Sequence, residues 1–271
     1  MPQIMGILNV TPDSFSDGGD YSSVNDAVNH ALLMYQQGAR WIDVGGESTR
    51  PGAEVVSSEQ ELQRVIPVIK ALCLAIPDSK ISIDTSKPEV MQAAVEVGAT
   101  MVNDVRALQA PGALSLVSEM QVDVCLMHMQ GSPPTMQQQV VYTDVVQEVK
   151  SFLLGRAKQC IEAGIKASRI IIDPGFGFGK SLAHNLLLLD QLDQFKDTGF
   201  KVLAGLSRKS MLGKITGQPV ENRSAASLAA ALIACLRGVD FIRVHDVAQT
   251  QDMLLVLEAL SACRKGESNA T

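Results

Sequence analysis

The chain alternates short apolar runs with longer amphipathic segments, and it does so eight times. Between the apolar runs, hydrophobic residues recur with the spacing of one helical face, as at Val24, Ala27, Val28, Ala31 and Tyr35. A regular alternation of strand and helix predicts βα units that build a parallel sheet. Eight units in 271 residues give about 34 residues each (271/8), the length of one such unit. The predicted strands cover residues 4–8, 41–44, 80–83, 100–102, 122–127, 169–172, 201–204 and 241–244.

The arrangement of these units favours a closed barrel over an open sheet. The strands are apolar on both faces, as expected for parallel strands covered by helices. Eight units without a long linker or a shift in composition favour a single-domain α/β fold, a (β/α)8 TIM barrel. An open, doubly wound sheet would be expected to carry a dinucleotide fingerprint, which the sequence lacks. We expect the barrel domain to span residues 1–263 and a polar tail to occupy residues 264–271.

Charge and composition exclude several classes of partner. The formal net charge is −6, from 23 basic and 29 acidic residues, so we expect neither nucleic acid nor an anionic membrane as partner. The longest apolar run, at 228–236, is far shorter than the ~20 residues that span a bilayer. The 5 cysteines are scattered and predict reduced, buried thiols. No basic segment precedes the first apolar run, so we expect no secretory signal and a cytoplasmic protein.

Polar side chains gather where the predicted strands end. In a barrel these ends meet at one mouth, where catalytic residues lie. A single carboxylate at a strand end is most often a helix cap, but polar residues at all eight strand ends favour a binding site. Clustered carboxylates raise one another's pKa, so they indicate a cationic or hydrogen-bonding ligand. The residues are Asn9, Asp43, Asp84, Asn103, Asp104, His128, Asp173, Ser207, Arg243 and His245.

Four loops after strands suggest what this ligand is. Residues 9–19 form a long polar loop that could close over a substrate, and residues 45–52 combine paired glycines with Arg50, a pattern that suits an anion. Residues 173–181 resemble a nucleotide-binding loop, but Pro174 and Lys180 stand where the two common motifs need glycine. A flat aromatic ligand fits this glycine-rich loop better. Residues 207–210 follow the seventh strand, where barrels commonly bind phosphate, and Arg243 and His245 add positive charge nearby.

Read together, these loops resemble the dihydropteroate synthase family of folate biosynthesis. The resemblance runs in order from residue 4 to about residue 262, although fewer residues precede Met5 than is common in the family. It implies a TIM barrel, a homodimer, Mg²⁺ as the metal, and sulfonamides as competitors of 4-aminobenzoate. It also implies condensation of 6-hydroxymethyl-7,8-dihydropterin pyrophosphate with 4-aminobenzoate to give 7,8-dihydropteroate and pyrophosphate. The matching segments are 5–19, 45–52, 83–88, 103–105, 173–180, 207–210 and 243–247.

The resemblance also implies roles for individual residues. A reduced pterin presents two parallel N–H donors, which a carboxylate accepts at both of its oxygens. Catalysis is thus expected from Asp84, Asn103, Asp173 and Lys209, with Met127 and Phe178 completing the pterin site. Pyrophosphate is expected at Asn9, Thr49, Arg50, Arg243 and His245, with Mg²⁺ on Asn9. The aminobenzoate pocket is expected from Phe15, Thr49, Pro51, Phe178, Lys209 and Ser210.

Aromatic amines are weak nucleophiles, so the implied reaction is expected to be dissociative, with pyrophosphate leaving first and Asp84 shielding the pterin cation.

Three other functions remain open at this point. A corrinoid-linked pterin methyltransferase barrel would share the pterin-reading carboxylates but would not need the 11–19 loop or the pair of Arg243 and His245. Lys209 could instead form the Schiff base of an aldolase. A non-catalytic pterin-binding paralogue would bind the pterin without turnover.

Overall fold

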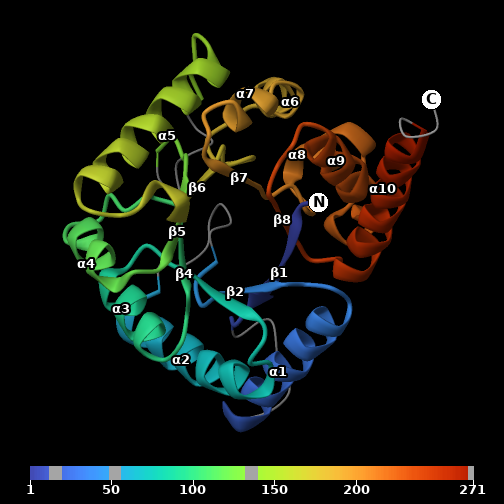
Figure 1. Cartoon of the computed structure of the whole chain (residues 1–271). Helices are drawn as coiled ribbons and strands as arrows, with labels where there is room; N and C mark the ends of the chain where they lie inside the picture. The colour runs from blue at the N-terminus through green and yellow to red at the C-terminus, as the bar shows by residue number, and fades with distance from the viewer. Residues whose placement is uncertain (12–19, 49–55, 132–139, 268–271) are drawn as a thin grey trace.

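Eight parallel strands close into a barrel in the order of the sequence, β1 to β8, as the view along its axis shows (Figure 1). The computed structural model describes residues 1–11, 20–48, 56–131 and 140–267. The barrel closes because β1 pairs with both neighbours, so that Met5 lies opposite Trp41 of β2 and Arg243 of β8. The predicted single-domain α/β barrel is confirmed. The strands are β1 (Gln3–Asn9), β2 (Trp41–Gly45), β3 (Lys80–Asp84), β4 (Met101–Asp104), β5 (Asp123–Met127), β6 (Ile170–Asp173), β7 (Lys201–Ala204) and β8 (Phe241–Val244).

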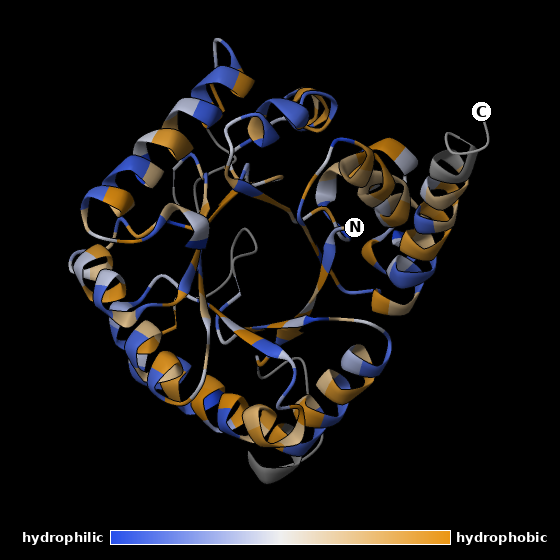
Figure 2. Cartoon of the chain, in the orientation of Figure 1, coloured by the Kyte–Doolittle hydropathy of each residue, from blue (hydrophilic) through white to orange (hydrophobic). Residues whose placement is uncertain are grey.

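The helices surround the barrel and cover the outer face of its strands (Figure 1). Most carry both hydrophobic and hydrophilic residues, as the hydropathy colouring shows (Figure 2), and their apolar residues pack against the strands in one large core. No helix among the described residues is long and apolar enough to cross a membrane. The helices are α1 (Asp20–Gln36), α2 (Ser58–Ala75), α3 (Pro88–Glu96), α4 (Ala113–Met120), α5 (Val145–Glu162), α6 (Leu182–Asp190), α7 (Asp193–Lys196), α8 (Ser210–Thr216), α9 (Ser224–Leu236) and α10 (Val247–Glu267), with short 3₁₀ turns at Ala167–Arg169 and Val220–Asn222.

The interior of the barrel has an apolar layer below a polar layer. The apolar layer includes an edge-to-face pair of Trp41 and Phe241, whose ring centroids are 6.0 Å apart. Alternate residues of a strand point to the same side, so residues two positions further along face inward as well. Beyond Trp41 and Phe241 these residues are Asp43 and Arg243. The complete apolar layer is Met5, Trp41, Met101, Cys125, Ile171, Leu203 and Phe241.

Some local predictions need correction. The capping box of α2 joins Ser57 to Gln60. Not all thiols are buried, because Cys263 is exposed on α10 and two others are half-buried. The backbone of α10 is helical as far as Glu267, beyond the start of the expected tail, and residues 268–271 lie outside the described part of the chain.

Candidate active site

An ionic network joins three strand ends at the mouth of the barrel, and Arg243 of β8 is at its centre. Its Nε donates to Asp43 Oδ2 at 2.6 Å, and its Nη2 donates to Asp84 Oδ2 at 2.7 Å. Asn103 Nδ2 donates to the same oxygen of Asp43 at 3.0 Å, so β4 joins β2, β3 and β8 in the network. Three of the predicted site residues, Asp84, Asn103 and Arg243, are therefore brought together.

Burial and mutual charge shift the pKa of these groups. Burial and the neighbouring Asp43 carboxylate raise the pKa of Asp84 to about 7, against the opposing effect of the Arg243 guanidinium. For Arg243, burial alone would lower the pKa, but the carboxylates of Asp43 and Asp84 raise it. Arg243 thus stays charged, and Asp84 titrates close to neutral pH. A cation that forms beside Asp84 would favour its ionised state.

Asp173, at the end of β6, forms the second part of the site. Its Oδ1 accepts a 2.7 Å hydrogen bond from the backbone N–H of Gly175, which fixes the carboxylate. Burial raises the pKa of Asp173, while the Gly175 N–H and the charge of Lys209 lower it. A buried carboxylate that is held in this way can accept paired N–H donors from a ligand.

Lys209 lies over the ring of Phe178, and its charge acts on Asp173. Its Nζ is 4.2 Å from the ring centroid, a cation–π distance. Burial lowers the pKa of Lys209 to about 8, and Asp173 opposes this shift. Phe178 packs with Met127 and Val105 in a small apolar cluster of its own. The site therefore combines an apolar wall with a carboxylate and an ammonium group, which suits a flat polar heterocycle.

The glycine-rich loop after β6 is built around Lys180. The buried Nζ of Lys180 donates to the carbonyl oxygens of Gly175 at 2.9 Å, Phe178 at 3.0 Å and His128 at 3.2 Å. It also lies 3.0 Å from His128 Nδ1. Burial and the charge of Lys180 lower the pKa of His128 to about 3, so the ring is neutral. Lys180 thus holds the loop from within and does not face the ligand as a phosphate-binding lysine would.

Two of the ten polar strand-end residues do not face the mouth. Asp104 accepts hydrogen bonds from Ser86 Oγ and from the backbone N–H groups of Arg106 and Leu108, so it shapes the turn after β4. His128 packs edge-on against Phe152 of α5, with the ring centroids 5.0 Å apart. Each follows an inward-facing residue by one position, and the alternation along a strand turns it away from the interior.

Of the predicted phosphate residues, Asn9 lies at the end of β1, and Arg243 and His245 lie at the end of β8. His245 Nδ1 is 2.9 Å from Ser207 Oγ, so the loops after β7 and β8 are in contact. Ser210 is exposed at the first turn of α8. Asn9 ends β1 opposite Gly45. The predicted residues Phe15, Thr49, Arg50 and Pro51 lie outside the described residues.

The oxygen atoms beside Gly45 suit a hard cation that arrives with a phosphate. Asn9 Oδ1 and Asp84 Oδ2 lie 3.8 and 3.9 Å from the position that a Cβ would take at Gly45. No group of three or more His, Cys, Asp or Glu in the described part of the chain could hold a metal. Mg²⁺ commonly binds through one or two protein oxygens together with substrate phosphates, so this donor set fits it.

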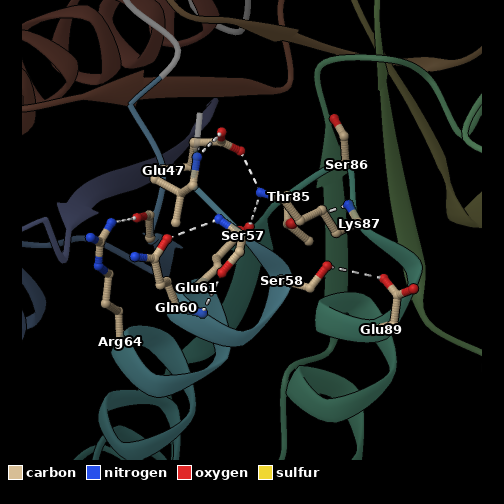
Figure 3. A network of polar contacts seen from close by, with 12 residues as sticks. Glu47, Ser57, Ser58, Gln60, Glu61, Arg64, Thr85, Ser86, Lys87 and Glu89 are labelled. Carbon is tan, nitrogen blue, oxygen red and sulfur yellow. Dashed lines mark hydrogen bonds and ion pairs between the residues drawn. The ribbon is translucent and has the colours of Figure 1, made fainter. Parts of the chain in front are cut away.

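The base of the loop after β2 is held by an ionic cluster. Lys87 Nζ lies 2.6 Å from Glu47 Oε2 and also pairs with Glu61 of α2, which is fully buried (Figure 3). The other oxygen of Glu47 accepts the Val56 N–H at 3.1 Å. Gly46 is required by packing, because a Cβ there would lie 2.7 Å from Val65 Cγ1. Gly46 therefore packs against α2.

Comparison with known proteins shows the family. Residues 5–245 match the model of the pterin-binding enzymes. A curated dihydropteroate synthase of Escherichia coli K12 is 50% identical over 266 residues, which cover 98% of this chain and 94% of that protein. The chain belongs to the dihydropteroate synthase family. A second family member, from Haemophilus influenzae, is 51% identical and covers 96% of this chain and 94% of its own length.

Solved structures of dihydropteroate synthases have the same fold. The enzyme of Xanthomonas albilineans with 4-aminobenzoic acid superposes with a TM-score of 0.91 at 52% identity, over 96% of this chain and 93% of the other. The same organism's enzyme with 7,8-dihydropteroate gives a TM-score of 0.87 at 50% identity, over 96% and 94%. A Yersinia pestis dihydropteroate synthase in a sulfonamide complex gives 0.91 at 46% identity, over 96% and 94%.

Two residues hold the site together although the sequence assigned neither of them this role. Asp43 was one of the polar strand-end residues, but nothing in the sequence indicated that it joins Asn103 to Arg243. Lys180 stood in the glycine-rich loop, but nothing indicated that its ammonium holds the loop from within. These residues act on the dihydropteroate synthase site by holding other side chains or backbone in place.

Proposed function

We propose that this chain is a transferase that condenses 6-hydroxymethyl-7,8-dihydropterin pyrophosphate with 4-aminobenzoate, giving 7,8-dihydropteroate and pyrophosphate. Family membership supports this reaction. The observation that carries it is the Asp173 carboxylate, which Gly175 fixes and on which the charge of Lys209 acts, with Lys209 over Phe178 and the network of Arg243 at the ends of neighbouring strands. Asp173, Lys209 and Phe178 suit a pterin, and Arg243 offers a charged guanidinium to a diphosphate.

The pterin would bind between Asp173 and the wall of Phe178 and Met127. Asp173 would accept the two N–H donors of the amino-pyrimidinone edge, and Asn103 would read the neighbouring donor and acceptor. Lys209 would donate to the ring carbonyl and N5. Gly175 supports this role for Asp173, because its N–H already fixes the carboxylate.

The diphosphate would bind toward Arg243 and His245, with Asn9, Thr49 and Arg50 contributing from the first two loops. We propose Mg²⁺ as the divalent metal, held on the protein by Asn9. When bound, the metal would supply positive charge that stabilises the leaving pyrophosphate. Arg243 is anchored by Asp43 and Asp84, so it would meet the diphosphate in a fixed orientation.

We propose a dissociative displacement for the chemical step. The bond between the pterin methylene carbon and the diphosphate oxygen breaks first, and both electrons leave with pyrophosphate. Asp84 would stabilise the resulting pterin cation, since a carboxylate whose pKa is raised to about 7 gains most from a nearby positive charge. The amine of 4-aminobenzoate then attacks the carbon and loses a proton. Its pocket would comprise Phe15, Thr49, Pro51, Phe178, Lys209 and Ser210.

The alternatives fit less well. The curated relatives at about half identity are dihydropteroate synthases, which favours the synthase over a corrinoid-linked pterin methyltransferase. A pterin-binding paralogue without activity would share the same site, and a measurement of turnover separates it from the enzyme.

We further propose a cytoplasmic homodimer. α9, with Ile233 and Leu236, and the neighbouring α10, with Leu255, Val256 and Leu260, expose large apolar side chains, and a second copy of the chain could cover them. Free cysteines suit a reducing compartment. Sedimentation of the protein and of Leu236→Glu would test the dimer, since the charged variant should sediment as a monomer if α9 forms the contact.

The decisive experiment is incubation with the pterin pyrophosphate, 4-aminobenzoate and Mg²⁺, followed by mass detection of 7,8-dihydropteroate. Asp173→Asn is the matched variant, because it keeps the size of the side chain but removes the paired acceptor. We expect product from the native protein and a loss of at least 100-fold in kcat/KM from the variant. Tight pterin binding without product would instead identify the storage protein.

A further inference from the structure

Arg208 has a backbone conformation that non-glycine residues rarely adopt. Its φ is +56°, in the left-handed region, where the Cβ of an L-residue is crowded. The next residue is Lys209, which lies over Phe178 in the candidate site. The direction of the Lys209 side chain therefore depends on a turn that the surrounding structure must hold in place.

Three contacts hold this turn. The Arg208 N–H donates to Ser227 Oγ of α9 at 2.9 Å, and its carbonyl oxygen accepts from Arg223 Nη1 at 3.2 Å. The Arg208 guanidinium pairs with both oxygens of Asp246, with Nη2 at 2.5 Å from Oδ1 and Nε at 3.4 Å from Oδ2. Backbone donor, backbone acceptor and side chain of one residue are thus all engaged.

The pair of Arg208 and Asp246 also connects two loops of the candidate site. Ser207 and His245 precede these two residues, and Ser207 Oγ lies 2.9 Å from His245 Nδ1. Ser207 and Arg208 on the loop after β7 thus face His245 and Asp246 on the loop after β8. The loop after β7 carries Lys209, which is expected at the pterin. The loop after β8 follows Arg243, which is expected at the diphosphate.

We infer that Arg208 and Asp246 form a positioning pair, which holds the left-handed turn at residue 208 and so aims Lys209 into the pterin site. Neither residue touches the reacting atoms in this role. The inference deepens the proposed function and rests on it for the role of Lys209. Arg208 and Asp246 are predicted to act as one unit, through Lys209.

The inference predicts an effect on the titration of Lys209 as well as on rate. Burial lowers the pKa of Lys209 to about 8, and the charged groups that act on it are Asp173, Asp84 and Arg243. If the turn relaxes, Lys209 moves toward water and its pKa rises toward the ordinary lysine value. The alkaline limb of pterin binding and of kcat/KM should then move to higher pH, which a general loss of stability would not cause.

The experiment compares Arg208→Ala, Asp246→Ala and the double variant. We expect each single variant to lower kcat/KM for the pterin pyrophosphate at least tenfold and to raise the alkaline limb by more than half a pH unit. The double variant should be no worse than either single one, because both remove the same interaction. Arg208→Asp with Asp246→Arg, which reverses the pair, should recover part of the loss.

Two further variants keep the test interpretable. Arg208→Gly accepts the left-handed conformation without crowding, so it removes the pair without adding strain, and should fold even if the alanine variant does not. Arg237→Ala breaks the exposed pair with Asp190 at the other end of α9 and should leave rate and pH profile unchanged.

Several results would overturn the inference. The inference is wrong if folded Arg208 and Asp246 variants match Arg237→Ala in rate and pH profile, or if the two single effects add in the double variant. A rise in KM with an unmoved alkaline limb would mean that Arg208 binds substrate directly. Equilibrium binding of 6-hydroxymethylpterin across the pH range needs no turnover. It therefore tests the pair even if the native protein forms no dihydropteroate, a result that would refute the proposed function alone.

Discussion

Asp43 and Arg243 form an ion pair of 2.6 Å across the inside of the barrel, although they are 200 positions apart in the sequence. Asp43 is fully buried, and the same oxygen also accepts from Asn103. One carboxylate therefore orients two side chains that are expected to contact the substrate.

Replacing Asp43 by Asn should lower kcat/KM by about 10- to 100-fold, because small displacements of positioned groups cost rates of this order. The amide keeps the shape of the side chain but removes the charge that holds Arg243. Steady-state kinetics with the pterin pyrophosphate would measure the loss. Asp240→Asn is the control, since Asp240 pairs with Lys196 outside the site. Equal kinetics in the two variants would contradict the role of Asp43.

The pH dependence of kcat/KM should be bell-shaped. Asp84 must be ionised to stabilise a cation, and its pKa is raised to about 7, so activity should fall as the pH drops below about 7. Lys209 must be protonated to donate, and its pKa is lowered to about 8, so activity should also fall above about 8. In the residual activity of Asp84→Asn the acidic limb should be absent. An acidic limb that survives in this variant would have to come from another group.

The dissociative step predicts loss of pyrophosphate without the second substrate. Protein incubated with Mg²⁺ and the pterin pyrophosphate alone should slowly release pyrophosphate and a hydrolysed pterin. A coupled phosphate assay would measure the release of pyrophosphate. Asp84→Asn should slow this release with little change in pterin affinity, since its charge matters mainly to the cation. Complete silence in the assay would favour a concerted displacement.

Gly175 should tolerate no side chain. Its φ is +68°, and a Cβ would lie 2.0 Å from the carbonyl oxygen of His128. Gly112 has a similar φ of +81° with nothing within 4 Å, so it isolates the cost of the conformation. We expect Gly175→Ala to lose about 1–3 kcal/mol more stability than Gly112→Ala, the usual cost of overpacking. Urea unfolding measures the difference, and equal losses would show that the loop gives way easily.

The barrel and the location of its site could be predicted from the sequence because their signals are local. Apolar runs and helical periodicity lie within a few residues of each other, and the strand ends follow directly. Asp84, Asn103 and Arg243 were found in this way, and the structure joins them in one network.

The functions of individual polar residues were less accessible, since they depend on partners far away in the chain. Asp104 and His128 stand at strand ends like the others, but the strand alternation turns them outward. Lys180 follows a glycine-rich loop as a phosphate-binding lysine would, yet three carbonyl groups surround its ammonium. Periodicity shows which side of the sheet a residue faces only when the bounds of the strand are known to within one residue.

The long separation of Asp43 and Arg243 has a consequence during translation. The ribosome makes Asp43 and Asp84 early, and their counterion Arg243 emerges 159 residues after Asp84. Until then the nascent chain holds two acidic groups that resist burial together. β8 therefore closes the barrel and neutralises the charge of Asp43 and Asp84 in one step. A chain truncated before β8 would have neither the closed barrel nor the counterion.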